Sequence, residues 1–347
     1  MKISNFDLTQ EVLVVAEIGN NHEGNFDVAK QLVVSAADCG VNAVKFQTFK
    51  SEFYVGRADA ARFDRLKSFE LTFSEFEELA SLAHSHGLLF FSTPFDLVSA
   101  AFLSDIVDAY KIASGDNTFY PLIDQVARTG KPIIVSTGIS STKQVQKTIE
   151  FVNQVWTSND IVGQLALLHC VSSYPVPNDQ ANLRSIQFLS ENFENSIGYS
   201  DHTLGIEASI LAVSLGAQII EKHFTLDKNF SDFRDHQLSA NPSEMKNLVT
   251  QIQLTSSMLG KKEKKVEKCE EDIVDAIRRS IVAGCDMVSG HRIEMSDLTW
   301  LRPAGGIPPG EEEVLIGKML KRKVTFGEQL STDDLEVSKN ENSTVDN

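Results

Sequence analysis

Eight short apolar segments recur along the first 225 residues, and nearly every one of them ends in a polar residue. They cover residues 12–17, 42–47, 88–93, 109–114, 133–137, 165–172, 196–202 and 219–225. The segments between them show the periodicity of amphipathic helices. Strands that alternate with helices are typical of βαβ units on a parallel sheet. Eight such units predict an α/β fold, a closed (β/α)8 barrel of the TIM type.

The pattern changes after residue 260. Residues 261–278 hold a dense run of Lys and Glu, which predicts a charged linker. From residue 279 to 338, short strand-like pieces alternate with turns, and this favours a small loop-rich domain. The polar residues 339–347 predict a frayed tail. The barrel would then occupy residues 1–260.

In a barrel of this kind, the residues at the carboxyl ends of the strands form the active site. Period-two alternation places Lys45 and Gln47 on one face of their strand, and Glu221 and His223 on one face of theirs. The polar residues at strand ends, which we expect to line one pocket, are Glu17, Lys45, Gln47, Thr93, Lys111, Ser114, Ser136, Ser172, His202, Glu221 and His223.

Two lysines stand out in this set. Lys45 and Lys111 come from different predicted strands, and hydroxyl side chains accompany both. Two ammonium groups with several hydroxyls suit a phosphate or phosphate-carboxylate ligand. The same lysines would also suit structural ion pairs with Glu17 or Glu221. Spacing alone leaves both interpretations open.

Two histidines end consecutive predicted strands. His202 and His223 would lie on neighbouring strands about 4.8 Å apart, close enough to share one ion. Two imidazoles without a nearby cysteine favour a hard divalent ion such as Mn²⁺ or Mg²⁺, with Asp201 as an acceptor that orients one ligand. The alternative is that each histidine is a hydrogen-bonded core residue.

Charge and composition exclude several classes of protein. The net charge of −16 argues against a nucleic-acid-binding or anionic-membrane surface, each of which needs a basic face. The four cysteines, Cys39, Cys170, Cys269 and Cys285, have no motif spacing and are typical of incidental thiols in a reducing compartment. With no signal-like or membrane-spanning apolar run, a cytoplasmic protein is expected.

Nine motifs in order resemble those of the sialic acid synthase family, which includes N-acetylneuraminate, legionaminate and pseudaminate synthases. They are AEIGNNHEG (16–24), VKFQTF (44–49), STPFD (92–96), YKIASGD (110–116), IVSTG (134–138), LLHCVSSYPVP (167–177), GYSDHTLG (198–205), EKHFTLD (221–227) and RDHQLSANPSEM (234–245). The C-terminal part resembles the antifreeze-like domain that accompanies these synthases.

The resemblance implies a reaction and a set of roles. The family condenses phosphoenolpyruvate with an N-acetylmannosamine-like amino sugar and releases phosphate. Phosphoenolpyruvate would be bound by Lys45, Gln47, Thr93, Lys111, Ser114, Ser136 and Ser172. The sugar would be contacted by Glu17, Tyr174, Glu221, Asp235 and Arg302. Glu17, Lys45, Lys111 and Glu221 would be catalytic, and His202 and His223 would bind Mn²⁺ or Mg²⁺.

Arg302 belongs to the antifreeze-like domain, so by resemblance it would reach the barrel of a second subunit in a domain-swapped homodimer. Ser172, the loop before Asp235 and the segment around Arg302 depart from the usual family pattern. These departures leave the acceptor sugar open. Two alternatives remain: another phosphoenolpyruvate-dependent aldol synthase or metal aldolase on the same barrel, and an inactive relative that binds a sugar or a protein partner.

Overall fold

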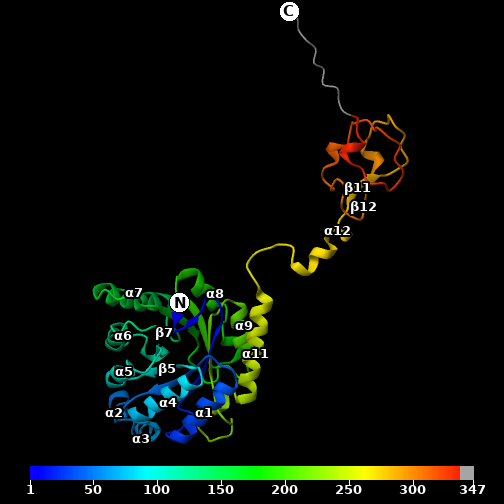
Figure 1. The fold of residues 1–347 in the computed structure, drawn as a ribbon. Helices are drawn as coiled ribbons and strands as arrows, with labels where there is room; N and C mark the ends of the chain where they lie inside the picture. The colour runs from blue at the N-terminus through cyan, green and yellow to red at the C-terminus, as the bar shows by residue number, and fades with distance from the viewer. Residues whose placement is uncertain (337–347) are drawn as a thin grey trace, which may run out of the picture. The chain divides into compact units, whose positions relative to one another are not determined.

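The computed structural model describes residues 1–336, in which two compact units are found: Met1–Gly260, and a second unit that begins at Lys261. The first unit is a closed barrel of parallel strands (Figure 1). The strands are β3 (Leu13–Gly19), β4 (Ala43–Thr48), β5 (Leu89–Pro94), β6 (Ala109–Ile112), β7 (Ile133–Ser136), β8 (Leu165–Cys170), β9 (Ser196–Asp201) and β10 (Ile219–His223). Pairing of β10 with β3 closes the barrel, which confirms the predicted fold class.

Helices follow the strands and surround the barrel (Figure 1). They are α1 (Phe26–Asp38), α2 (Ser51–Tyr54), α3 (Ala60–Phe69), α4 (Phe73–Ser85), α5 (Leu97–Leu103), α6 (Tyr120–Ala127), α7 (Thr142–Ser158), α8 (Ser185–Asn192), α9 (Glu207–Ser214), α10 (Asp235–Leu238) and α11 (Pro242–Leu259). At the start of α4, the Thr72 side chain accepts from the Glu75 amide and Glu75 accepts from the Thr72 amide. Satisfying these free amides defines where the helix begins.

Strand alternation separates two cores. Outward-facing residues such as Phe46 and Phe90 pack against the helices, while Leu13, Ala43 and Ile219 fill the barrel interior near the start of the strands. A short hairpin that no sequence pattern predicted, β1 (Lys2–Ile3) with β2 (Phe6–Asp7), packs against this interior cluster. The hairpin therefore covers the amino end of the barrel, opposite to the strand ends that carry the polar residues.

The second unit has its own small core. Strands β11 (Ser280–Ala283) and β12 (Leu298–Leu301) pair antiparallel, and Ile281, Leu315 and Val324 are among the residues buried beneath them. The predicted charged linker contains a 3₁₀ helix (Lys268–Ile273) and α12 (Val274–Ile277). The predicted tail, residues 339–347, lies outside the described residues. Within residues 1–336, no helix is both long and apolar enough to span a bilayer.

The barrel wall leaves no room for a side chain at Gly198 on β9. A Cβ atom there would lie 2.5 Å from the Ile219 carbonyl oxygen and 2.6 Å from a methyl carbon of Leu168. We expect Gly198→Ala to lower the free energy of unfolding of the barrel by about 1–3 kcal/mol because of this overpacking. Gly56→Ala is the control, since a Cβ atom added there would have no other atom within 4 Å. Urea denaturation should separate the two variants, and equal stabilities would contradict the prediction.

Candidate active site

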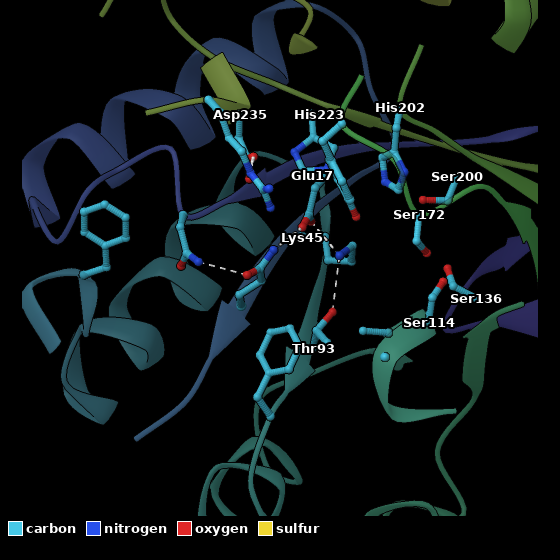
Figure 2. Close-up of a pocket in the computed structure, with 18 of the residues that line it drawn as sticks. Glu17, Lys45, Thr93, Ser114, Ser136, Ser172, Ser200, His202, His223 and Asp235 are labelled. Atoms are coloured by element: carbon cyan, nitrogen blue, oxygen red, sulfur yellow. Dashed lines mark hydrogen bonds and ion pairs between the residues drawn. The ribbon is translucent and has the colours of Figure 1, made fainter. Parts of the chain in front are cut away.

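The carboxyl ends of the strands surround a cavity of about 1200 Å³. All the predicted barrel residues line it, namely Glu17, Lys45, Gln47, Thr93, Lys111, Ser114, Ser136, Ser172, Tyr174, His202, Glu221, His223 and Asp235. Figure 2 shows many of them pointing into this space from separate strands. Arg302 lies in the second unit with an exposed side chain. The structure thus gathers the predicted residues of the barrel, whereas their roles remain predictions.

A chain of buried charges crosses the cavity floor. Lys45 Nζ lies 2.6 Å from Glu17 Oε2 and 3.7 Å from Glu221 Oε1. Lys111 Nζ, from a strand on another side of the barrel, lies 3.7 Å from the same Glu221 oxygen. These are the ion pairs that the sequence offered as an alternative to an anion site. Because these pairs lie on the floor of a cavity, structural pairing does not exclude contact of the same lysines with a ligand.

The two lysines differ in how far nearby carboxylates compensate their buried charge. Burial by itself would lower the pKa of Lys45, but Glu17 and Glu221 outweigh it, and the pKa is raised. Burial lowers the pKa of Lys111, and the attraction of Glu221 offsets only part of that effect. A buried ammonium with too little compensating charge favours an additional anion. Lys111 is therefore the better anchor for an anionic ligand.

The pKa values of the two glutamates shift in opposite directions. Burial raises the pKa of Glu17 in spite of the opposing Lys45. Burial would also raise the pKa of Glu221, but Lys111 and Lys45 together lower it to about 2, and Ser200 Oγ donates to it at 2.9 Å. When the pKa values of two neighbouring carboxylates diverge, the group with the raised pKa typically transfers protons and the other stays charged.

Hydroxyl groups line the side of the cavity near Lys111. Ser114 Oγ accepts from the Gly138 amide at 3.1 Å. A Cβ atom on Gly138 would lie 2.6 Å from Ser114 Oγ and 2.5 Å from Ser172 Oγ, so only glycine fits between the two serines. Among the described residues, the buried Ser136 Oγ has no hydrogen-bond partner. Unpaired buried hydroxyls call for a ligand or water, and this supports an anion-binding wall.

The two histidines face each other across the neighbouring strands β9 and β10, with ring centroids 5.4 Å apart. His202 Nδ1 lies 2.9 Å from the Val171 carbonyl oxygen. Because a carbonyl can only accept, Nδ1 carries the proton and Nε2 keeps a free lone pair. Burial lowers the pKa of His223 to about 3, so this imidazole is neutral near pH 7. Its buried Nδ1 has no partner among the described residues.

This donor set fits a divalent ion in part. The neutral His223 is a suitable ligand, and so is His202 whenever its Nε2 is deprotonated, although Cys170 and the Val171 carbonyl outweigh burial and raise the pKa of His202. Within residues 1–336, however, no group of three His, Cys, Asp or Glu side chains is placed to hold a metal. An ion here would take its remaining ligands from water or substrate, which is the arrangement of an open, reactive site.

Asp201 does not orient a metal ligand as the sequence suggested. Its side chain faces the opposite side of β9, where it accepts from the Thr203 amide at 2.8 Å and from Ser209 Oγ at 2.7 Å. Lys222 Nζ lies 3.1 Å from it, and both side chains are fully buried. Since strand neighbours point to opposite faces, Asp201 instead secures the loop that follows His202.

A loop after β10 forms the opposite rim of the cavity. Arg234 lies over the ring of Tyr174 at 5.0 Å, and its Nε is 3.2 Å from Asp235 Oδ1. The loop is tied down by Glu23, which accepts from Ser231 Oγ and from His236 Nε2. Asp235 thus reaches the cavity because a residue of the first βα loop holds its segment in place.

Sequence reasoning missed several lining residues. Cys170 was set aside as an incidental thiol, yet it lies on the cavity wall, where Ser114 Oγ donates to its Sγ at 3.6 Å. Ser200 was also missed. Both share the inward parity of their strands, so strict period-two counting would have found them. The lining residues of α3, Arg62 and Arg65 among them, follow no strand and carried no such signal.

Comparison with known proteins identifies the family. The NeuB family model matches residues 32–264. The chain belongs to the NeuB family. Residues 278–336 match the SAF domain, so the predicted sialic acid synthase resemblance and its C-terminal domain are confirmed.

Several relatives of this NeuB-family chain are named as synthases. An uncharacterized protein of Methanocaldococcus jannaschii is 40% identical over 94% of this chain and 95% of its own length. The N,N'-diacetyllegionaminic acid synthase of Legionella pneumophila is 39% identical over 93% of this chain and 94% of its own. The crystal structure of N-acetylneuraminic acid synthetase from Leptospira borgpetersenii, in complex with citrate, is 34% identical with a TM-score of 0.74, covering 78% and 94% of the two chains.

The Lys45–Glu17 pair gives a testable stability effect. Lys45→Met would leave Glu17 buried without its partner, and we expect the barrel to lose about 3–5 kcal/mol of unfolding free energy. Adding Glu17→Gln should recover much of this loss, because the unpaired charge is then removed. A double-mutant cycle from urea denaturation measures the coupling. If the double variant were as unstable as the sum of the single variants, the pair would not be coupled.

Proposed function

We propose that this NeuB-family protein condenses phosphoenolpyruvate with an N-acetylmannosamine-like amino sugar to give a nonulosonic acid and phosphate. The observation that carries the proposal is the arrangement of the cavity floor. There, an under-compensated Lys111 and the unpaired Ser136 hydroxyl lie on one side, and the histidine pair lies on β9 and β10. An anionic reactant and a carbonyl reactant would thus have separate places in one cavity.

Phosphoenolpyruvate would bind on the lysine side. Lys111, Ser114 and Ser136 would bind its phosphate, because these groups supply donors and positive charge around one wall. Lys45, Gln47, Thr93 and Ser172 would complete the contacts, as the family resemblance assigns them. Thr93 already lies within hydrogen-bond distance of Lys45, at 3.3 Å from Nζ to Oγ1 (Figure 2), which holds the ammonium toward the cavity.

The amino sugar would bind on the histidine side, with Tyr174 and Asp235 as walls. His202 and His223 would hold Mn²⁺ or Mg²⁺ through the nitrogens that are left free. A bound divalent ion would polarise the aldehyde oxygen of the open-chain sugar as a Lewis acid. The protein's own contribution is to fix the His202 ring through the Val171 carbonyl and to keep the His223 imidazole neutral through burial.

Carbon–carbon bond formation would join C3 of phosphoenolpyruvate to the aldehyde carbon, move the C=O π electrons onto the aldehyde oxygen, which takes up a proton, and leave positive charge at C2. Water would add at C2 and lose one proton. The resulting C2 hydroxyl would lose its proton as the bond from C2 to the phosphate oxygen breaks, which gives the ketone and free phosphate. Glu17 suits the role of proton acceptor, because its raised pKa brings it nearer to neutral pH. Glu221 stays ionised, with its pKa near 2, and would stabilise positive charge on Lys45, Lys111 and the reacting centre.

The proposed synthase would work as a homodimer. Arg302 is exposed in the SAF unit, away from any ion pair among the described residues. By family resemblance it would reach the sugar in the partner's barrel and exclude water from the reacting centre. This arrangement predicts that each site uses residues from two chains.

Substrate use is tested by phosphate release from phosphoenolpyruvate with Mn²⁺ or Mg²⁺. The acceptor panel holds N-acetylmannosamine, 6-deoxy diacetamido hexoses, which the Legionella relative's name suggests, and a pentose phosphate. We expect chelator-sensitive release with one amino sugar, lowered by at least about 10³-fold in Lys111→Ala. A folded protein that releases phosphate only with the pentose phosphate, or with no acceptor, would contradict the proposal.

Shared sites are tested by mixing inactive subunits. Arg302→Ala and Lys111→Ala homodimers should each have little activity. Subunits that are unfolded and refolded together should recover up to about a quarter of wild-type turnover, because half of the chains would form mixed dimers with one intact site each. Lys111→Ala mixed with Lys45→Ala is the control, since both defects lie in the barrel. Equal activity in the two mixtures would exclude a shared site.

A further inference from the structure

A chain of amide hydrogen bonds leads from the cavity floor to the loop after β3. Gln47 Nε2 donates to Glu17 Oε1 at 3.1 Å, and Asn20 Nδ2 donates to Gln47 Oε1 at 2.9 Å. An ionised carboxylate can only accept, so Gln47 must turn its amino group toward Glu17 and its oxygen toward Asn20. Asn20 must then donate to Gln47, which leaves its own oxygen, Oδ1, as the free end of the chain.

The Asn20 oxygen is buried and has no partner. The residue is 7% exposed and lines the cavity, and its Oδ1 has no hydrogen-bond partner among residues 1–336. Folded proteins rarely leave a buried amide oxygen unpaired, so such a group at a cavity calls for a ligand or water. A carbonyl oxygen can only accept, and the ligand group that satisfies it must therefore be an O–H or an N–H.

The backbone around Asn20 fixes the direction of its side chain. Its carbonyl oxygen accepts from the Glu23 amide at 2.9 Å. The preceding Gly19 has a φ of +54°, which favours glycine. A Cβ atom on Gly19 would also lie 3.1 Å from Glu17 Oε1 and 3.2 Å from Gln47 Nε2. The missing side chain thus leaves the space through which the amide chain passes.

The topology places Asn20 on the side of the cavity that we assign to the amino sugar. Asn20 directly follows β3, which pairs with β10, the strand that ends in His223. Glu23, in the same loop, accepts from His236 Nε2, next to Asp235. The lysine side, on β6 and β7, is separated from β3 by β4 and β5. A ligand group that reaches Asn20 is therefore part of the sugar rather than of phosphoenolpyruvate.

We propose that Asn20 is a specificity-determining residue, which accepts a hydrogen bond from one hydroxyl or acetamido N–H of the amino sugar. This inference rests on the proposed function. With the sugar bound, the hydrogen bonds run in one direction, from the sugar to Asn20, from Asn20 to Gln47 and from Gln47 to Glu17. Bonds aligned in this way polarise and strengthen one another. A sugar without that donor would exclude water and leave the oxygen unpaired, so the site rejects it.

The test measures KM for the amino sugar that supports phosphate release and for a panel of its analogues, at saturating phosphoenolpyruvate. Each analogue lacks one donor, either a hydroxyl or the acetamido N–H, which an ester oxygen replaces. Asn20→Leu has a similar shape and removes both polar groups, whereas Asn20→Asp keeps an acceptor oxygen. Asn25→Asp is the matched control for charge, because Asn25 is exposed in the same loop and caps α1, a position that Asp also fills well.

We expect Asn20→Leu to raise the KM for the sugar about tenfold, with the KM for phosphoenolpyruvate unchanged. One analogue should have a similarly raised KM in the wild type, and for this analogue Asn20→Leu should have no further effect, because the hydrogen bond is already lost. Asn20→Asp should keep the KM for the sugar within about threefold of the wild type, since the acceptor remains. Asn25→Asp should match the wild type.

Two outcomes would overturn the inference and leave the proposed function intact. One is an unchanged KM for the sugar in Asn20→Leu. The other is a KM that Asn20→Leu raises by the same factor for every analogue, which would make the effect structural. If no amino sugar gives a keto acid, the proposed function fails instead. Calorimetric titration of the wild type and Asn20→Leu with the alditol of N-acetylmannosamine, which has no aldehyde and cannot react, would still decide whether Asn20 binds the sugar.

Discussion

The burial of opposite charges at one end of a parallel barrel is the constraint on which this site depends. An isolated buried charge is costly, so each must have a partner. Register supplies the first, since Glu17 lies directly opposite Lys45 on the neighbouring strand. Glu221 supplies the second, because it contacts lysines from β4 and β6 across the interior. The pairing of these buried charges therefore depends on strand order and on closure of the barrel. Replacing one charged residue alone would leave its buried partner uncompensated.

A second layer of buried polar groups lies outside the barrel and serves the loops. Lys222 and Asp201 pair between the strands and the helices, and Lys222 also donates to the Thr203 carbonyl. Glu23 joins the first βα loop to His236, more than 200 residues later in the chain. The Lys222–Asp201 pair does not line the cavity, whereas Glu23 lies at its rim. Both contacts fix the segments that carry His202 and Asp235, so the accuracy of the site depends on groups that take no part in chemistry.

Most of the barrel was predictable, because period-two alternation and helix caps are local signals. The inward direction of Lys45 and Glu221 follows from strand geometry alone. What the sequence did not reveal depends on contacts between distant segments. The N-terminal hairpin has too few residues for a pattern, and it forms because the barrel interior offers Ile3 an apolar surface. Helix α3 contacts the loop after β10 through the packing of Phe69 on Phe233, and the pairing of Asp201 with Lys222 depends on where β10 lies.

The N-terminal hairpin restricts the route by which ligands can enter and leave the cavity. With the amino end of the barrel covered, traffic between the cavity and water passes through the mouth at the strand ends. In the proposed reaction, a ligand bound against Lys111 on the floor would then enter before one bound against Tyr174 and Asp235 near the rim, and it would leave after it. Closure of the amino end would thus be enough, by geometry alone, to set an order in which two ligands bind and are released.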